Sequence, residues 1–517
     1  MMKILVYISF VLAMLIPCKR ALHMFQQNRY ELPRYSMWLK SWRADKYDKL
    51  AALCFIAVFF KKHNIAYVIF IGTFLLMAVL HYLDEKKKNY IKPLVYTARV
   101  KRQIVVLTIL VLLIVFLCYK IGFIWLLILL VVVLPWLLIY PLGFITDPIE
   151  ASIRNGFMNE ARAILKDHNN LIKIGITGSY GKTSTKNIIQ SMISEQYNSL
   201  MTPASFNTPN GITITIREML KPIHQVFVCE MGADKVGEIT ELVNFVKPSI
   251  GVVTSIGPQH LATFGSLENI IKEKMQMIEL LPKDGIGIIN VDNEYIRNYE
   301  IKNKDVKVIT YGITSEDADY RACDITYTPN GSHFNVVHNG EKYEMETKLL
   351  GEHNVLNILS SIACARELNV PWEVVQKGAK SMKQVEHRLE IKKFNGYRFI
   401  DDAFNSNPVG SAMALEVMSY MPNKRFIVTP GMIDLGAIQD ETNKEFGKKM
   451  KDKVDVVILV GKQQTSKIYE GLEEVNFDMN NVHIVDNVKE AFNLVYREAT
   501  PEDTILLEND LPDAFSH

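Results

Sequence analysis

The stretch GITGSYGKTSTKN, residues 175–187, decides the fold of the larger part of this chain. It continues an apolar run that begins at residue 172, and it leads into sequence that favours a helix. Glycines let the backbone curl so that successive N–H groups point at phosphate oxygens, and a helix N-terminus adds a favourable dipole. Lys182 can reach the β- and γ-phosphates of a nucleotide, and the Thr183 hydroxyl can bind Mg²⁺. This context predicts an ATP site rather than a glycine-rich turn with a chance GKT.

Short apolar strands and amphipathic helices alternate around this loop, which predicts an α/β fold with a mainly parallel sheet covered on both faces. We expect strands at residues 171–177, 226–230, 251–256 and 285–290, and helices at residues 182–195, 236–245, 267–280 and 354–368. Residues 306–350 are richer in β-type residues and turns, so they are expected to form an antiparallel edge.

A second alternating block begins near residue 397 and predicts a separate, smaller Rossmann-like domain. Its expected strands are residues 398–401, 425–429, 454–460 and 504–507, and its expected helices are residues 409–420, 442–451 and 488–497.

Composition narrows the classes of protein. The 517 residues suggest about three domains. The 58 Lys and Arg against 56 Asp and Glu give a net charge of +2, which does not indicate nucleic-acid binding. None of the six cysteines lies in a CxxC pair, so neither a zinc ribbon nor a disulfide framework is indicated.

The first 148 residues contain five apolar runs, at residues 4–18, 50–60, 65–83, 104–118 and 121–140. The third and fifth are long enough to cross a membrane, whereas the first and fourth need flanking residues to reach the usual length of about 20. The second is shorter, and a soluble core helix is the alternative for it. The first run lacks a small-residue cleavage site, which favours an anchor over a removable signal peptide.

Charge selects a topology. Residues 19–49 and 84–102 carry eight and seven Lys or Arg, and basic loops stay in the cytoplasm. The ATP site must lie there too. Five spans satisfy both requirements with the N-terminus outside, whereas four would place residues 19–49 outside. The predicted layout is a helical transmembrane region at residues 1–148, an ATP-binding domain at 149–385 and a Rossmann-like domain at 386–517, in a multi-pass cell-membrane protein with cytoplasmic catalytic domains.

Six ordered motifs resemble the Mur ligase family. The loop has the compact T-G-x-x-G-K-T form, because Ile176 stands where the common template has glycine. It is followed by FVCEMGADKVGEI (227–239), TSIGPQHLATFGSLENIIKEK (254–274), GEHNVLNILSSIACA (351–365), HRLEI (387–391) and FIDDAFNSNP (399–408). The chain most resembles the D-alanyl-D-alanine-adding branch of this family.

The resemblance implies an amide ligase that uses ATP and Mg²⁺. ATP phosphorylates a substrate carboxylate, an amine attacks the acyl phosphate, and an amide forms with release of ADP and phosphate. The residues it implies as catalytic are Lys182, His260, Lys274 and Arg388, and those for metal are Thr183, Glu230 and His260. Those for the nucleotide are Gly178, Ser179, Gly181, Lys182, Thr183, Ser184, Asn354, Asn357, Arg388 and Asp402, and those for the substrate are Asn207, Asn405 and Asn407. In several members Lys274 would be a carbamate, with an ordinary solvated lysine as the alternative. A buried structural carboxylate is the alternative for Glu230.

Departures from the family concern the substrates. Apolar runs stand where the UDP-binding domain is expected, Ala403 and Phe404 replace a Ser and a Tyr, and the usual basic segment near the C-terminus is missing. The expected partners are ATP, an envelope carboxylate, an amino acid or dipeptide amine, and membrane lipid, without nucleic acid. A peptidoglycan ligase is the first hypothesis. Alternatives are a ligase for another envelope or poly-amino-acid carboxylate, or a non-catalytic ATP-binding membrane regulator.

Overall fold

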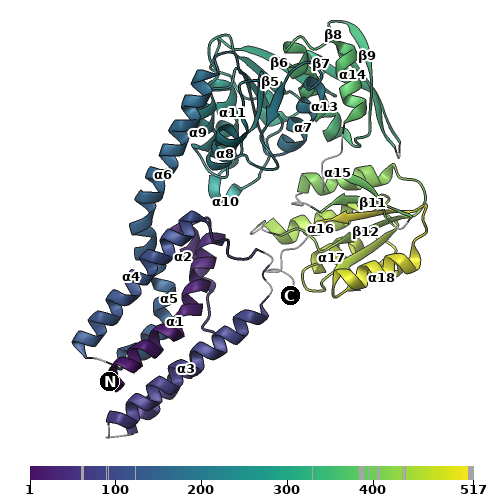
Figure 1. The fold of residues 1–517 in the computed structure, drawn as a ribbon. Helices are drawn as coiled ribbons and strands as arrows, with labels where there is room; N and C mark the ends of the chain where they lie inside the picture. Colours follow the sequence, from purple (N-terminus) through teal and green to yellow (C-terminus); the bar gives the residue numbers. More distant parts are fainter. Residues whose placement is uncertain are drawn as a thin grey trace. The chain divides into compact units, whose positions relative to one another are not determined.

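The chain forms two compact units, Met1–Gly156 and Phe157–His517 (Figure 1). The computed structural model describes residues 1–59, 63–88, 90, 92–122, 124–328, 330–382, 389–394, 396–403, 408–433, 435 and 438–509. Three predicted site residues, Arg388, Asn405 and Asn407, lie outside the described residues. The predicted domain boundaries, after residues 148 and 385, stay predictions.

The first unit is helical. Its elements are α1 (Met2–Gln27), α2 (Leu32–Ser41), the 3-10 helix η1 (Asp48–Phe59), α3 (His63–Lys87), α4 (Ala98–Ile121), α5 (Leu126–Leu137) and α6 (Ile139–Asp167). Four stretches are helical, long and apolar enough to cross a membrane: Met2–Gln27, Asn64–Lys87, Ala98–Ile121 and Leu126–Asp167. On α4, Val105, Ile109 and Phe116 are each more than half exposed, so the apolar surface of this helix faces outward.

The second of the five expected spans differs from the prediction. Residues 50–59 lie in η1, a 12-residue 3-10 helix, instead of an α-helix of spanning length. At about 2.0 Å per residue, η1 extends roughly 24 Å, short of the ~30 Å of a hydrocarbon core. Asp48 at its start accepts a hydrogen bond from His81 near the end of α3 (3.1 Å), so η1 and α3 run antiparallel. The chain therefore traverses this bundle five times, and among the described residues four of these passes have spanning length.

The second unit contains a nine-stranded sheet in the order β2-β3-β1-β4-β5-β6-β7-β8-β9. Its strands are β1 (Ile172–Thr177), β2 (Ser199–Met201), β3 (Val226–Glu230), β4 (Ile250–Val253), β5 (Ile286–Asn290), β6 (Lys307–Gly312), β7 (Tyr320–Thr328), β8 (Gly331–His338) and β9 (Glu341–Thr347). Strands β1 to β7 pair in parallel, and β7, β8 and β9 pair antiparallel. The expected parallel sheet with an antiparallel edge is confirmed.

Helices cover both faces of this sheet, as expected for buried parallel strands. They are α7 (Lys182–Ile193), α8 (Pro209–Met219), α9 (Glu238–Val246), α10 (Leu261–Phe264), α11 (Leu267–Glu279), α12 (Glu294–Arg297), α13 (Glu352–Glu367) and α14 (Trp372–Ser381). One core joins α7, α13 and α14 to the sheet, and the other joins α8, α9, α11 and the end of α6 to it. Alternate strand residues enter opposite cores: Val226 and Val228 one, Phe227 and Cys229 the other.

A smaller sheet has the order β10-β11-β15-β12-β13-β14. Its strands are β10 (Glu390–Phe394), β11 (Tyr397–Asp402), β12 (Arg425–Thr429), β13 (Val456–Val460), β14 (Val482–Val485) and β15 (Thr504–Glu508). Its helices are α15 (Pro408–Ser419), α16 (Gln439–Lys449), α17 (Ser466–Glu474), η3 (Met479–Asn481) and α18 (Val488–Glu498). All pairs are parallel except β10 with β11, which confirms the Rossmann-like prediction.

Candidate active site

The loop between β1 and α7 has the backbone of a phosphate-binding turn. Gly178 has a φ of +149° and Gly181 a φ of +84°, conformations that L side chains rarely adopt. A Cβ on Gly181 would lie 2.5 Å from Oδ1 of Asn357, so space as well as conformation requires glycine there. The loop therefore leads directly into the N-terminus of α7, where the backbone N–H groups of the first turn can meet a phosphate.

Ser179 holds this loop against the segment that follows β4. Its backbone N–H donates to Ser255 O (2.6 Å), and its hydroxyl exchanges hydrogen bonds with the backbone of Gly257 (3.0 Å). The Thr254 hydroxyl donates to Tyr180 O (2.5 Å) from the same side. The buried Ser179 side chain therefore fixes the loop, while a phosphate would meet backbone groups. Ser184 is half-buried in the first turn of α7.

Lys182 and Thr183 begin α7 with their polar groups at the loop. The Lys182 ammonium donates to the carbonyls of Gly178 (2.7 Å) and Ser179 (3.1 Å), so it lies over the turn that it would share with a nucleotide. The Thr183 hydroxyl donates to Oε1 of Glu230 at the end of β3 (3.1 Å). The structure thus brings together Thr183 and Glu230, two of the residues predicted to bind metal, because adjacent parallel strands β1 and β3 end at one edge of the sheet.

Glu230 is a buried carboxylate with three side-chain neighbours. It is 1% exposed, and besides Thr183 it accepts from Nδ2 of Asn207 (3.0 Å) and pairs with Nζ of Lys186 (3.0 Å). Lys186 is also 1% exposed and donates to Ala204 O (2.5 Å). The sequence prediction placed Asn207 near this site but missed Lys186. The signal for Lys186 was its spacing, since it lies one helical turn after Lys182 and Thr183.

His260 lies at the start of α10, where its φ is +56°. Its Nε2 is 3.3 Å from Oδ1 of Asp234, and its side chain is 45% exposed. Asp234 follows β3 by four residues, and the sequence prediction missed it, although it lies inside the quoted motif FVCEMGADKVGEI.

Lys274 is buried on α11, with 3% of its surface exposed, so the alternative of an ordinary solvated lysine is wrong. Its ammonium donates to Ala233 O (3.2 Å) and lies 5.7 Å from the Phe264 ring centroid. Burial, together with the nearby charge of Lys182, lowers the pKa of Lys274 to about 7. An amine with this pKa is largely unprotonated just above neutral pH, so it can act as a nucleophile.

The neighbouring Glu273 positions this part of α11. Its buried carboxylate accepts from the backbone N–H groups of Gly237 (2.8 Å) and Ile239 (2.6 Å) at the start of α9. A carboxylate is favourable there because the first N–H groups of a helix lack intrahelical partners. This contact holds α11 against α9 and thereby fixes Lys274 beside Ala233.

The two predicted asparagines of α13 have different partners. Oδ1 of Asn357 accepts from the Thr185 hydroxyl (3.2 Å) and packs against Gly181, so Asn357 lies at the phosphate loop. Nδ2 of Asn354 donates to Leu350 O (2.8 Å), within its own chain segment. In the smaller sheet, Oδ1 of Asp402 accepts from Leu389 N (3.1 Å). The nucleoside contacts of these residues stay predictions.

The donor set suits Mg²⁺, which is bound by one or two carboxylates together with hydroxyl, water and phosphate oxygens. Glu230 and Thr183 supply a carboxylate and a hydroxyl 3.1 Å apart at the mouth of the phosphate loop. Within the described part of the chain, no group of three His, Cys, Asp or Glu residues is arranged to hold a metal ion. The protein's own contribution at Glu230 is thus small, which fits an ion that arrives with nucleotide phosphates.

Comparisons with known proteins agree with this geometry. The family model "Mur ligase middle domain" matches residues 176–365, and "Mur ligase, glutamate ligase domain" matches residues 387–508. The chain is 32% identical over 340 residues to the UDP-N-acetylmuramoyl-tripeptide–D-alanyl-D-alanine ligase of Bacillus subtilis, covering 65% of this chain and 72% of that protein. The chain belongs to the Mur ligase family. It is therefore an ATP-dependent, amide-forming ligase by family.

Another relative and two solved structures show how much of the chain is similar to known Mur ligases. The Escherichia coli ligase of the same name is 30% identical over 292 residues, which is 56% of this chain and 64% of that protein. Crystal structure I of MurF from Acinetobacter baumannii has a TM-score of 0.63 at 24% identity, covering 70% of this chain and 78% of that one. MurF ligase from Thermotoga maritima in complex with ADP has a TM-score of 0.62 at 22% identity, covering 69% and 80%. These structures share the Mur ligase fold with this chain.

Proposed function

We propose that this Mur ligase is a membrane-embedded enzyme that uses ATP and Mg²⁺ to join an amine to the carboxylate of a peptidoglycan precursor. The observation that carries the proposal is that the phosphate loop, Thr183 and Glu230 lie together at one edge of the sheet. The Thr183 hydroxyl is 3.1 Å from Oε1 of Glu230. The relatives named for D-alanyl-D-alanine addition support a dipeptide as the amine and a UDP-linked tripeptide as the carboxylate.

The residues supply positive charge and donors where negative charge would develop. Backbone N–H groups of the loop and the Lys182 ammonium would hold the phosphates, and Thr183 with Glu230 would hold Mg²⁺, which supplies charge neutralisation at the transferring phosphoryl group. The amine would then attack the carbonyl carbon of the acyl phosphate, so that the new C–N bond forms as the C–O bond to phosphate breaks and the nitrogen loses a proton. Arg388, Asn405 and Asn407 stay assigned by family resemblance.

Lys274 has the properties needed for a carbamate. Carbamate formation joins an unprotonated amine to CO₂ and releases one proton, and the lowered pKa of about 7 makes that amine available. The product would carry a negative charge near Lys182, whose cation would then stabilise it. Asp234 and His260 lie on the same side of the site, so a carbamate there could join them as a metal ligand.

The first unit supports a multi-pass membrane location. At one bundle end, Lys3 of α1 donates to Tyr119 O of α4 (3.3 Å). At the other end, Arg102 of α4 pairs with Glu150 of α6 (2.7 Å). The described residues of the two basic segments meet at this second end, where Nε2 of His23 lies 2.7 Å from Lys92 O. The basic segments and the exit toward the catalytic unit thus share one side, as the positive-inside rule requires.

The location suggests a substrate that is itself membrane-linked. Confining enzyme and substrate to one surface raises their effective concentration. The test gives the full chain in nanodiscs ATP, Mg²⁺ and D-alanyl-D-alanine with either a soluble UDP-linked tripeptide or its lipid-linked counterpart. Amide formation with either substrate, absent in the Lys182→Ala variant, supports the ligase. Equal use of both substrates would refute the preference for the lipid-linked form, and amide formation with neither would refute the peptidoglycan assignment.

A second candidate is a ligase for another envelope or poly-amino-acid carboxylate. Ala403 and its neighbours favour this candidate, because the motif FIDDAFNSNP, which contains predicted substrate residues, differs there from the family motif. Phosphate release that needs an amine but not the tripeptide would support it. A non-catalytic regulator is disfavoured, because the buried Lys186–Glu230 pair and the phosphate loop are both in place.

A further inference from the structure

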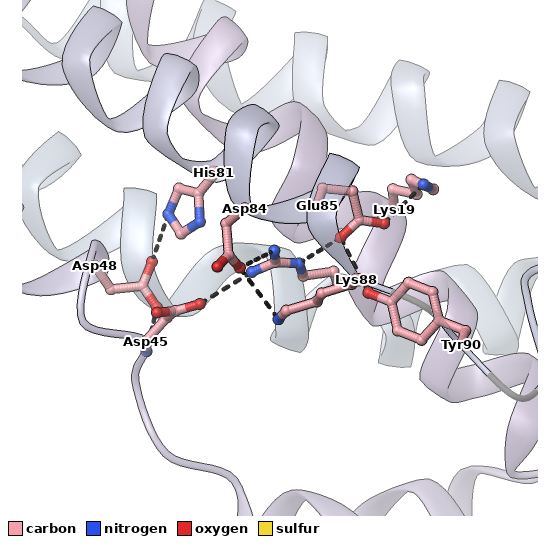
Figure 2. Close-up of polar contacts among 9 residues, drawn as sticks. Lys19, Asp45, Asp48, His81, Asp84, Glu85, Lys88 and Tyr90 are labelled. Carbon is pink, nitrogen blue, oxygen red and sulfur yellow. Dashed lines mark hydrogen bonds and ion pairs between the residues drawn. The ribbon is translucent and has the colours of Figure 1, made fainter. Parts of the chain in front are cut away.

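The bundle end with the basic segments contains a cavity of about 150 Å³. Its polar lining comes from α1, from the segment that leads into η1 and from the end of α3. Figure 2 shows the polar contacts of Asp45, Asp48, His81 and Lys88 of this lining with their neighbours. Trp42 and Trp136 add two indole rings to the lining. A cavity of this size at a helix-bundle end is large enough for several water molecules or one small charged group.

Arg20 is the centre of the cluster. Its guanidinium donates to Asp45 (3.0 Å), Asp84 (2.8 Å) and Glu85 (2.8 Å), and only 10% of its side chain is exposed. Lys19 also pairs with Glu85 (2.7 Å). Three separate chain segments are thus tied together by one side chain, which holds this wall of the cavity in place.

His81 provides an independent sign of a ligand. Its side chain is 1% exposed, and Nε2 is 3.1 Å from Oδ1 of Asp48. Its other ring nitrogen, Nδ1, is buried without a hydrogen-bond partner among the described residues. This Nδ1 is a buried polar atom without a partner in a side chain that lines the cavity, so a polar group bound in the cavity can meet it. A phosphate oxygen would satisfy it.

Charge at the lining favours an anion. Arg20, Arg43 and Lys88 line the cavity with two carboxylates, Asp45 and Asp48, so the lining itself has an excess of one positive charge, while Asp84 and Glu85 beside it are paired with Arg20. The guanidinium of Arg43 donates to the carbonyl of Trp42 (2.9 Å), and Lys88 pairs with Asp84 (3.3 Å) with 42% of its side chain exposed. These two long side chains can turn toward a ligand while the Arg20 frame stays in place.

We propose that this cavity binds the phosphate of a lipid headgroup. The inference rests on the proposed membrane location of the first unit. Basic pockets between membrane helices on the cytoplasmic side suit anionic headgroups, and tryptophan is favoured at the depth of the headgroups. The exposed apolar side chains Leu15 and Leu83, close in sequence to the lining, would lie along the acyl chains. The same phosphate chemistry would serve a resident phospholipid or a lipid-linked substrate.

The test measures lipid binding to the purified full chain in neutral detergent. Native mass spectrometry counts bound phosphatidic acid during a titration, with phosphatidylcholine and inorganic phosphate as separate arms. The Arg43→Gln/Lys88→Gln variant removes two cations of the cavity, and the Lys86→Gln/Lys87→Gln variant removes two neighbouring cations outside its lining. We expect one saturable phosphatidic acid site, weakened at least tenfold in the first variant and less than twofold in the second.

A third variant, His81→Gln, keeps a donor toward Asp48 and removes the group at Nδ1, so it should weaken binding with the fold intact by circular dichroism. Equal weakening by both double variants would overturn the proposal, because it would reflect surface charge alone. If inorganic phosphate displaced phosphatidic acid when both were at the same concentration, the proposal that the bound phosphate belongs to a lipid would be overturned. The wild-type protein could insert into liposomes and form the amide product yet bind no phosphatidic acid. That result would overturn this inference without affecting the proposed function.

Discussion

Replacing Lys186 by methionine should strongly destabilise the catalytic unit, and removing the charge of Glu230 as well should restore most of the loss. The two side chains form an ion pair at 3.0 Å with 1% of each exposed. In Lys186→Met the carboxylate keeps its hydrogen bonds from Thr183 and Asn207 but loses its only paired cation among the described residues. In Lys186→Met/Glu230→Gln no buried charge remains.

The size of the expected loss of stability follows from the burial of Lys186 and Glu230. Breaking one side of a buried ion pair costs about 3–5 kcal/mol, because the remaining charge is desolvated without compensation. Replacing both partners by neutral groups of similar size is often close to neutral. A domain of 150–250 residues loses roughly 2–4 °C of melting temperature per kcal/mol, so the single variant should melt on the order of 10 °C lower.

The assay is thermal unfolding of the purified full chain in detergent, followed by near-ultraviolet circular dichroism without and with Mg²⁺. A double-mutant cycle isolates the coupling between the two residues. Mg²⁺ should raise the melting temperature of Lys186→Met more than that of the wild type, because the unpaired carboxylate gains a cation in the folded state only. The matched control is the exposed pair of Lys272 with Glu268, where Lys272→Met should change little. Additive losses in the double variant would refute the reasoning.

Four further outcomes are expected. Lys182→Ala should abolish ATP-dependent phosphate release with an unchanged circular dichroism spectrum, and unchanged turnover would contradict its place in the phosphate loop. His260→Gln should raise the Mg²⁺ concentration needed for half-maximal activity, whereas an unchanged Mg²⁺ dependence would remove His260 from the metal site. Because the folded-state pKa of Lys274 is lowered from 10.5 to about 7, the unfolded chain holds this proton longer, and stability should rise from pH 7 to pH 10. Lys274→Met should remove this part of the rise, worth up to roughly 5 kcal/mol, in melting curves compared across pH. Reporter fusions after Glu31 and Glu85 should both report the cytoplasm, and an extracellular signal at the first would favour four crossings.

Much of the fold follows from local sequence patterns. The strands around the phosphate loop were predicted because fully buried parallel strands read as apolar runs, and the loop because its glycines and Lys182 are contiguous in sequence. Short elements were missed, among them β2, α8, β14 and α17. Three-residue β2 is too short for a periodic signal, and α17 has only nine residues, with Gly471 among them. The η1 segment was taken for an α-helical span because hydropathy does not distinguish a 3-10 helix from an α-helix.

The sequence by itself determined the family, the α/β class and the residues that can touch a phosphate, because these depend on contiguous motifs. Only the tertiary structure decided which side chains meet. Lys186 and Glu230 are 44 residues apart in sequence and form one buried pair, because β1 and β3 are adjacent parallel strands. His81 and Asp48 face one cavity because η1 and α3 run antiparallel. Such contacts depend on how distant segments pack, and no local pattern of charge or hydropathy encodes that packing.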